Sequence, residues 1–270
     1  MKARNKRLKV FSVTGILAII VLFTLPNISW VSSVEKKDTV STIAPITDSA
    51  AVLAPSIVFS NYVNDVYEAI HLQQAGLALP VFEKALTGFV NLKSNNHLNS
   101  NKEILTVVDF TKSSTEKRMW IIDLKNNKIL LNTYVAHGRG SGDDMATTFS
   151  NISESHQSSL GFYVTNETYQ GKHGLSLKLD GFDKGINHLA RARAIVVHGA
   201  DYVSEKFINQ HGRLGRSHGC PAVPAELNKT VIDLIKDKTC LFINGNSNTY
   251  QSNLLDTSSA SQNFTVQRNS

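Results

Sequence analysis

The central part of the chain is a series of short apolar runs, rich in β-branched and aromatic residues and separated by loops rich in Gly, Ser and Asn. Runs of this kind, bounded by turn-forming residues, are typical of β-strands rather than of helices. The expected strands are 104–110, 119–124, 129–136, 161–165, 175–179, 194–197 and 240–244. The pattern therefore predicts a strand-dominated domain over residues 104–245.

Three segments have helical periodicity instead. The first is expected to begin at Asn61, after which apolar residues recur once per helical turn. The other two, 80–92 and 224–235, each begin with a Pro, which is favourable in the first turn of a helix. The first two helices form a helical prefix over residues 59–103. The expected fold class is mainly β with flanking helices (α+β).

The net charge of +6 comes almost wholly from the N-terminus. Five of the 28 basic residues lie within the first ten positions, and no acidic residue precedes Glu35. The other 23 basic residues are nearly balanced by the 22 acidic residues, so the rest of the chain is at +1. A nucleic-acid partner is therefore not expected, because binding to a phosphate backbone requires an excess of Lys and Arg in the folded part.

The N-terminal cations run directly into an apolar stretch over residues 10–25. This order is typical of an export signal, and it also fits an uncleaved membrane anchor, so both remain open for residues 1–33. This segment is expected to contact the membrane or the export machinery, which places the protein in the periplasm or cell envelope. Residues 34–58 are predicted to be a flexible linker, and the polar residues 246–270 a disordered tail.

A histidine and a cysteine stand in two short motifs. An apolar run ends at His198-Gly199, and Cys220 follows Gly219 in a turn shortly before the last predicted helix. Catalysis by Cys requires a thiolate, which a nearby imidazole can provide by accepting the proton. Gly219 permits a tight turn in which backbone N–H groups converge on a developing oxyanion. The motifs therefore indicate nucleophilic catalysis by Cys220.

Other roles for these residues remain open at this point. Cys220 fits a small buried residue without reactivity, or a disulfide with Cys240 in an oxidising compartment. The alternative of a zinc site formed by His198, His211, His218 and Cys220 lacks a Cys-x-x-Cys or His-Glu-x-x-His pair. Two cysteines are also too few for a disulfide scaffold or a four-thiolate zinc site. No metal or cofactor is expected.

His198-Gly199 followed by Ser217-His218-Gly219-Cys220 resembles the signature of the YkuD-like L,D-transpeptidases of bacterial cell-wall assembly. Further blocks resemble one branch of them, the murein L,D-transpeptidase catalytic-domain proteins. These blocks are residues 82–86, 108–110, 136–142, 149–151, 158–163, 171–177 and 215–223. The resemblance covers roughly residues 60–245. It implies a mostly antiparallel, β-sandwich-like catalytic domain preceded by a short helical segment.

The resemblance also implies roles for individual residues. Cys220 would be the nucleophile and His198 the base, and the carbonyl of Gly199 would orient the imidazole. His218, Gly219 and Cys220 would line the oxyanion hole, chiefly through backbone N–H groups. His218 stands where this branch more often has Trp, although it matches the wider family.

Four further residues are expected to contact the substrate. Arg216 and Ser217 adjoin the turn of Cys220, Arg139 lies in a Gly-rich loop, and His173 lies in a Gly-Lys-His-Gly segment. Arg binds carboxylates, such as those of a peptidoglycan stem peptide, through paired hydrogen bonds. The alternative for the arginines is a solvated surface position.

The activity that the resemblance implies is the formation of 3→3 cross-links between stem peptides through a thioester on Cys220. One alternative is an L,D-carboxypeptidase that passes the same thioester to water. Another is a catalytically silent envelope protein that binds peptidoglycan.

Overall fold

The structure is a computed structural model that describes residues 54–269. The predictions for residues 1–33, and for all but the last few residues of the linker, lie outside the described residues. Within residues 54–269, no helix combines the length and the apolar character that a membrane span requires.

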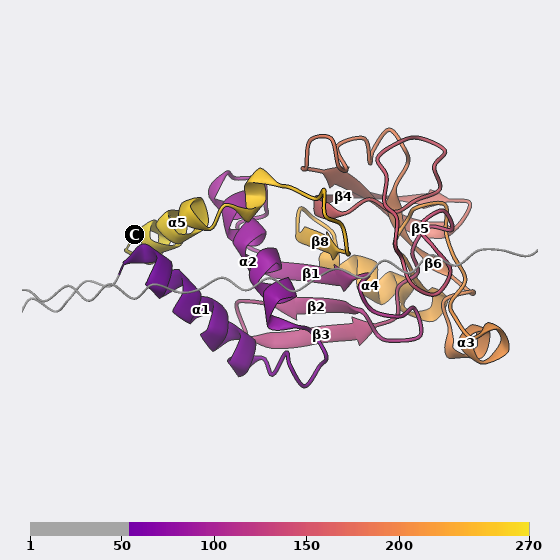
Figure 1. The fold of residues 1–270 in the computed structure, drawn as a ribbon, viewed down its shortest axis with the longest axis horizontal. Helices are drawn as coiled ribbons and strands as arrows, with labels where there is room; N and C mark the ends of the chain where they lie inside the picture. Colours follow the sequence, from indigo (N-terminus) through magenta and orange to yellow (C-terminus); the bar gives the residue numbers. More distant parts are fainter. Residues whose placement is uncertain (1–53, 270) are drawn as a thin grey trace, which may run out of the picture. The chain divides into compact units, whose positions relative to one another are not determined.

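The strands form one mixed sheet in the order β3-β2-β1-β8-β4-β5-β6-β7. All of them except β7 are labelled in Figure 1. Their bounds are β1 Ile104–Asp109, β2 Met119–Asp123, β3 Lys128–Thr133, β4 Gly161–Gly171, β5 Gly174–Gly181, β6 Val196–Ala200, β7 Ala222–Pro224 and β8 Cys240–Asn244. Neighbouring strands are antiparallel except for β1 with β8 and β6 with β7, which are parallel. The predicted fold class, mainly β with flanking helices, is confirmed.

Each central strand contributes to two cores, because successive side chains of a strand point to opposite faces. In β1, Leu105 and Val107 belong to one core, whereas Val108 belongs to the other. The same alternation separates Phe242 from Leu241 in β8. Both faces are covered, so these strands are almost fully buried and read as continuous apolar runs.

Helices cover the two faces unequally. On one face lie α1 (Pro55–Ala69) and α2 (Leu79–Ser94), which share the core of Leu105 and Phe242. On the other face lies α4 (Asn228–Ile235), preceded by a 3-10 turn. The prefix and the strands therefore share one core. Pro55 lies in the first turn of α1, so this helix starts before Asn61 and includes residues 55–58 of the predicted linker.

Some elements are absent from the prediction. The strand β7 has only three residues, and α3 (Glu205–His211) is a short helix with no fully buried side chain. Ser204 caps α3 by accepting a hydrogen bond from the N–H of Phe207. Neither element has enough apolar residues to produce a periodic signal. The strands β4 and β5 also extend beyond the predicted runs into exposed, polar residues.

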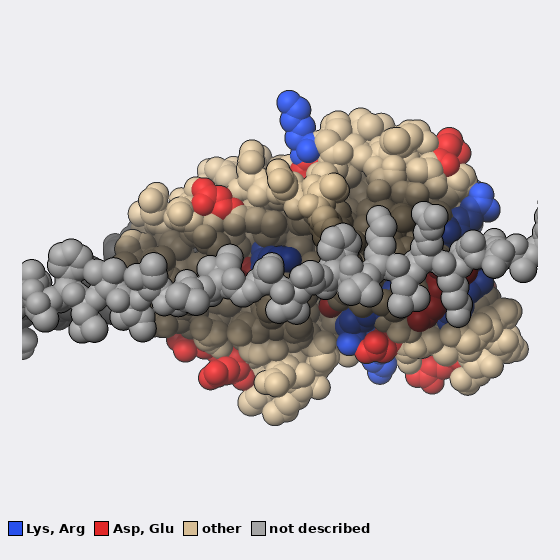
Figure 2. Space-filling view, viewed as in Figure 1, with Lys and Arg blue, Asp and Glu red and all other residues tan. Residues whose placement is uncertain are grey.

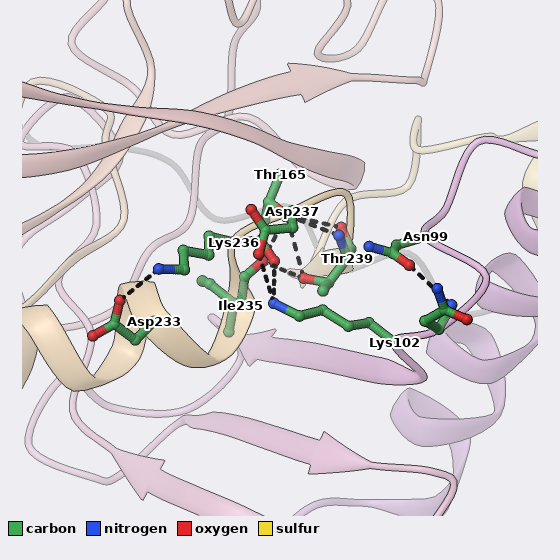
Figure 3. Close-up of polar contacts among 9 residues, drawn as sticks. Asn99, Lys102, Thr165, Asp233, Ile235, Lys236, Asp237 and Thr239 are labelled. Carbon is green, nitrogen blue, oxygen red and sulfur yellow. Dashed lines mark hydrogen bonds and ion pairs between the residues drawn. The ribbon is translucent and has the colours of Figure 1, made fainter.

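The connection between α4 and β8 is fixed by polar contacts (Figure 3). Lys102 Nζ donates to the carbonyl of Lys236 at 3.0 Å and to Asp237 at 2.9 Å. The hydroxyl of Thr165 donates to the carbonyl of Ile235 at 2.6 Å, near the end of the helix. These contacts tie the end of α4 to β4 and to the segment that precedes β1.

The tail that the sequence predicts to be disordered instead forms α5 (Thr257–Asn269), which packs against α1 and α2. The rings of Tyr62 and Phe264 stack with centroids 4.2 Å apart. The buried Asn91 side chain of α2 donates to the carbonyls of Leu254 at 2.9 Å and Asp256 at 3.0 Å. The few apolar residues of this segment suffice because Ala260 and Phe264 join the core that α1 and α2 share with the sheet.

Replacing Phe264 with Ala should lower the free energy of unfolding by about 3 kcal/mol, because a buried aromatic ring is lost from the helix layer. Val266 lies on the same helix but is 68% exposed, so Val266→Ala should change it by less than about 0.5 kcal/mol. Urea denaturation of the two variants measures both values. A loss for Phe264→Ala as small as that for Val266→Ala would show that α5 does not stabilise the domain.

Candidate active site

The turn that carries Cys220 is built around Ser217. The Ser217 hydroxyl accepts a hydrogen bond from the N–H of Gly219 at 3.0 Å and donates to the carbonyl of Cys220 at 2.6 Å. Gly219 has φ +119°, and a Cβ at this position would lie 2.7 Å from the carbonyl oxygen of Gln157. Both the backbone angle and the close contact therefore require Gly next to Cys220.

The Cys220 thiol lies beside the segment that enters β6. The N–H of Val196 donates to Sγ at 3.5 Å, and the thiol donates to the carbonyl of Ala194 at 3.7 Å. Burial raises the pKa of Cys220 above the ordinary value of 9.0. The resting site therefore contains a thiol rather than a preformed thiolate.

His198 reaches the site through the register of the sheet. It lies on β6, opposite Ser176 of β5 and opposite Ala222 of β7, two residues after Cys220. Its Nδ1–H donates to the carbonyl of Gly199 at 3.0 Å, an arrangement that leaves Nε2 with its lone pair. Burial lowers the pKa of His198, so the ring is a neutral base.

Gly199 is required for the packing behind this histidine. A Cβ on Gly199 would lie 2.8 Å from Cβ of Asn228 in the first turn of α4. Gly therefore allows α4 to approach the strand, while its carbonyl holds the imidazole.

Cys220 and His198 line the same cavity, which has a volume of about 400 Å³. Among the described residues, no hydrogen bond joins Sγ to the His198 ring. Three cations, Lys172, Arg193 and Arg216, also line the cavity, and no Asp or Glu of the described chain does. The electrostatic character of the cavity therefore favours a ligand with negative charge.

The four residues predicted to contact substrate differ in their positions relative to the cavity of Cys220. His173 lies between β4 and β5, lines the cavity, and stacks on His198 with centroids 4.6 Å apart. Arg216 also lines the cavity, but it is paired with Asp143 at 2.6 Å. Ser217 lines the cavity as well, but the residue is buried and its hydroxyl is already hydrogen-bonded inside the turn. Arg139 is exposed outside the cavity lining, and only its backbone N–H contacts the site, by donating to the Ser217 carbonyl at 2.8 Å.

The backbone N–H groups predicted to line the oxyanion hole are not all free to donate a hydrogen bond. The N–H of Gly219 is bonded to Ser217, which makes it unavailable in this conformation. Within the described residues, no group accepts a hydrogen bond from the backbone N–H of His218 or Cys220. The His218 ring is exposed and lies edge-to-face with His156, at a centroid distance of 4.3 Å. The pKa of the His218 ring is nevertheless lowered, first by loss of some solvation and then by the nearby Arg139 charge.

A buried network fixes the Gly-rich loop beside the turn. Arg118 is fully buried, and its guanidinium donates to Nδ1 of His137 at 2.8 Å. Nε2 of His137 then donates to the carbonyl of Gly142 at 3.3 Å, and the same carbonyl accepts from Arg216 at 2.9 Å. Burial and the Arg118 charge lower the pKa of His137 to about 4, so this ring is neutral. The network connects the protein interior to the cavity wall.

Within the described residues, the structure contains neither the zinc site nor the disulfide considered as alternatives. The ring of His211 stacks on Phe207 in α3, at a centroid distance of 4.0 Å. Over residues 54–269, no cluster of three or more His, Cys, Asp or Glu side chains is arranged to hold a metal ion. Cys220 and Cys240 are both free thiols, and Cys240 is buried on β8.

Sequence reasoning missed Arg193 as a residue of the site. Arg193 lines the cavity and donates to the loop 150–159, including to Ser159 Oγ at 2.6 Å and to the Gln157 carbonyl at 2.8 Å. In the sequence it belongs to Arg191-Ala192-Arg193, which has the character of a solvated surface turn. Its position five residues before His198 was the one available signal.

Residues 73–244 match the family model of the L,D-transpeptidase catalytic domain. The match begins before α2 and ends at the last residue of β8, so it includes both His198 and Cys220. A search of curated proteins finds no match to this chain.

Several solved structures are similar to the chain at low sequence identity. An L,D-transpeptidase from Mycobacterium smegmatis is 12% identical with a TM-score of 0.33, over 53% of this chain and 59% of that chain. The helical cell shape determining protein Pgp2 from Campylobacter jejuni is 13% identical with a TM-score of 0.36, over 68% and 64%. The similarity thus spans about three fifths of each of these proteins. Because the family match covers more than half of its residues, the chain belongs to the L,D-transpeptidase catalytic domain family.

Proposed function

We propose that the protein is a peptidoglycan L,D-transpeptidase that uses Cys220 as its nucleophile. The observation that carries this proposal is the cavity shared by the Cys220 thiol and His198, whose Nδ1 is held by the Gly199 carbonyl. A neutral base in the same cavity as a thiol can accept its proton during attack on a carbonyl. The family membership supports the reaction class, and the geometry supports the assignment of the two residues.

In the proposed acylation, Sγ attacks the carbonyl of a diaminopimelate L-centre in a tetrapeptide stem. The thiol proton moves to Nε2 of His198, and the oxyanion is stabilised by the unpaired N–H groups of His218 and Cys220. The C–N bond to the terminal D-Ala then breaks, and His198 returns the proton to the leaving amine. The product is a thioester on Cys220.

In the second half-reaction, a side-chain amine of a neighbouring stem attacks the thioester. His198 takes a proton from the attacking amine, and the thiolate leaves and is reprotonated. The product is a 3→3 cross-link between two stems. If water replaces the amine, the same thioester gives a tripeptide, which is the L,D-carboxypeptidase reaction.

The substrate assignment is supported by charge. Lys172 and Arg216 line the cavity, and a stem peptide carries carboxylates that such cations bind. Basic and acidic side chains are interspersed on the visible part of the face in Figure 2, unlike the continuous basic surface of a nucleic-acid-binding protein.

The site of action is part of the proposal. The basic and apolar segment of residues 1–33 would direct export to the periplasm or cell envelope, either as a cleaved signal or as a membrane anchor. The substrate is then available, because peptidoglycan lies outside the cytoplasmic membrane.

The proposal is tested by incubating residues 34–270 with purified disaccharide-tetrapeptides and analysing the products by mass spectrometry. Dimers that have lost one D-Ala are expected. Tripeptides without dimers would identify a carboxypeptidase instead. An unchanged tetrapeptide, with no covalent adduct from a thiol-directed carbapenem, would overturn the enzymatic assignment in favour of a silent binding protein.

A further inference from the structure

Arg193 lies in the backbone turn that borders the Cys220 thiol. The next residue, Ala194, has φ +53°, an uncommon angle for a residue with a Cβ, and its carbonyl accepts the thiol hydrogen bond. The N–H of Val196 contacts the same sulfur. Residues 193–196 therefore form one wall of the nucleophile's surroundings, and Arg193 contributes the charged side chain of that wall.

The Arg193 guanidinium holds a loop against the catalytic turn. Its hydrogen bonds go to the Ser150 carbonyl at 2.8 Å, Ser159 Oγ at 2.6 Å, the Gln157 carbonyl at 2.8 Å and Ser155 Oγ at 3.3 Å.

The loop in turn contacts the residue that precedes the nucleophile. Ser158 donates to the Gly219 carbonyl at 3.2 Å, and the Gln157 carbonyl blocks the space where a Gly219 Cβ would lie. One guanidinium nitrogen of Arg193 would itself lie 3.4 Å from such a Cβ. The guanidinium is thus directly behind the Gly219-Cys220 turn.

The charge of Arg193 is not compensated by a carboxylate among the described residues. All four of its hydrogen-bond acceptors are neutral oxygens. By contrast, Arg191, two positions away, is paired with Glu167 and Asp180, and Arg216 is paired with Asp143. A half-buried cation without an anionic partner is costly, and that cost falls when negative charge arrives beside it.

We infer that Arg193 is a positioning residue for Cys220: it fixes the loop behind the catalytic turn and supplies the uncompensated positive charge that stabilises the thiolate as Sγ loses its proton. This inference rests on the proposed role of Cys220 as nucleophile. In the resting site, burial raises the pKa of the thiol, and the Arg193 charge opposes that shift. Burial therefore favours the thiol form of Cys220 in the resting site, and the Arg193 charge stabilises the thiolate that forms when a base removes the proton.

Other titratable and charged groups face the cavity of Cys220. They are His198 on β6, Lys172 and His173 between β4 and β5, Tyr169 on β4, Tyr202 after β6, and Arg216 and His218 on the loop of Cys220 itself. Arg193 differs from Lys172 and Arg216 in two ways: it is half-buried with no acidic partner among the described residues, and it contacts the catalytic turn.

The test is the pH dependence of iodoacetamide alkylation of the full chain in detergent, with Cys220→Ser reporting any reaction at Cys240. For the wild type, the midpoint is expected at a higher pH than for an ordinary cysteine thiol, because burial raises the pKa of Cys220. Arg193→Gln and Arg193→Met should alkylate about tenfold more slowly at pH 7.5, with the midpoint about one pH unit higher. Arg193→Lys keeps the charge and should stay within about threefold of the wild type. Arg191→Gln is the matched control and should leave the profile unchanged.

Two results would overturn the inference. One is a wild-type profile in the folded neutral variants. The other is an Arg193→Lys profile shifted as far as that of the neutral variants, which would show a purely structural role for the guanidinium. If neither neutral variant folds, an Arg193→Lys midpoint about one pH unit or more above that of the wild type overturns the inference, because Lys keeps the positive charge but not the fork of guanidinium hydrogen bonds.

A separate kinetic measurement distinguishes substrate binding from action on the nucleophile. A neutral variant should lower kcat of cross-link formation more than it raises KM. A rise in KM with an unchanged alkylation profile would show that Arg193 binds a substrate carboxylate, which contradicts the inference. Cross-linking that persists in Cys220→Ser would instead refute the proposed function, whatever the Arg193 variants do.

Discussion

The Cys220→Ala variant is expected to form neither cross-linked dimers nor tripeptides from disaccharide-tetrapeptides. Both products require the thioester on Sγ, and no other described thiol lines the cavity. Removing the nucleophile of a covalent mechanism lowers turnover by about 10⁴-fold or more. Cys220→Ser should behave similarly, because a serine hydroxyl is a much weaker nucleophile than a thiol beside a neutral imidazole. The measurement is quantitative mass spectrometry of the products over time.

The matched control is the second cysteine of the chain. Cys240 is fully buried on β8, where it packs in the core beneath the helices. Cys240→Ala should retain cross-linking activity, so a loss in both variants would indicate damage to the fold rather than loss of a nucleophile. Activity of Cys220→Ala near that of Cys240→Ala would remove Cys220 from the mechanism.

Replacing Gly219 with Ala is expected to reduce acylation about 100-fold while leaving the protein folded. The new Cβ would lie 2.7 Å from the Gln157 carbonyl, and the φ of +119° is unfavourable for Ala. The turn must therefore shift, and a displacement of about 1 Å at a nucleophile costs a rate factor of this size. The measurement is the rate at which a carbapenem adduct forms on Cys220, followed by intact-protein mass spectrometry, together with thermal unfolding.

The control Gly212→Ala separates the effect of an unfavourable backbone angle from the effect of the contact with Gln157. Gly212 ends α3 with φ +71°, and a Cβ there would meet no atom within 4 Å. This variant should lose about 1 kcal/mol of stability and retain the wild-type acylation rate. An equal loss of acylation in both variants would show that the contact with Gln157 does not set the position of Cys220.

Local sequence patterns were sufficient to predict the helices and strands whose own residues specify their burial. The apolar run of β8 predicts a buried strand because five successive buried residues cannot be placed at a solvated surface. The helix α2 was predicted nearly in full, from Pro80 and its apolar periodicity. The end of the tail was misassigned because Phe264 is stabilised by Tyr62, a residue some 200 positions earlier, and such a contact leaves no local pattern.

The candidate site divides in the same way. The motifs His198-Gly199 and Ser217-His218-Gly219-Cys220 by themselves indicated a Cys nucleophile with a His base, since a thiolate needs a proton acceptor and Gly permits the tight turn beside it. Only the tertiary structure decided how these residues are used. Parallel pairing of β6 with β7 places His198 next to the strand that follows Cys220. The Ser217 hydroxyl braces the turn, because it is hydrogen-bonded to two backbone groups, and the residue also lines the cavity, so its predicted contact with substrate stays a prediction.

The sequence by itself therefore determined the fold class and the candidate nucleophile and base, because apolar periodicity and residue types are local properties. Burial and partners distant in the sequence decided which charged side chains of the site are neutralised. Arg191 and Arg193 are indistinguishable in sequence, yet Glu167 and Asp180 neutralise the first, whereas the second lines the cavity of Cys220 and has no carboxylate partner within residues 54–269. The physical reason is that the free energy of a charge depends on the groups and the solvent around it, which only the folded chain specifies.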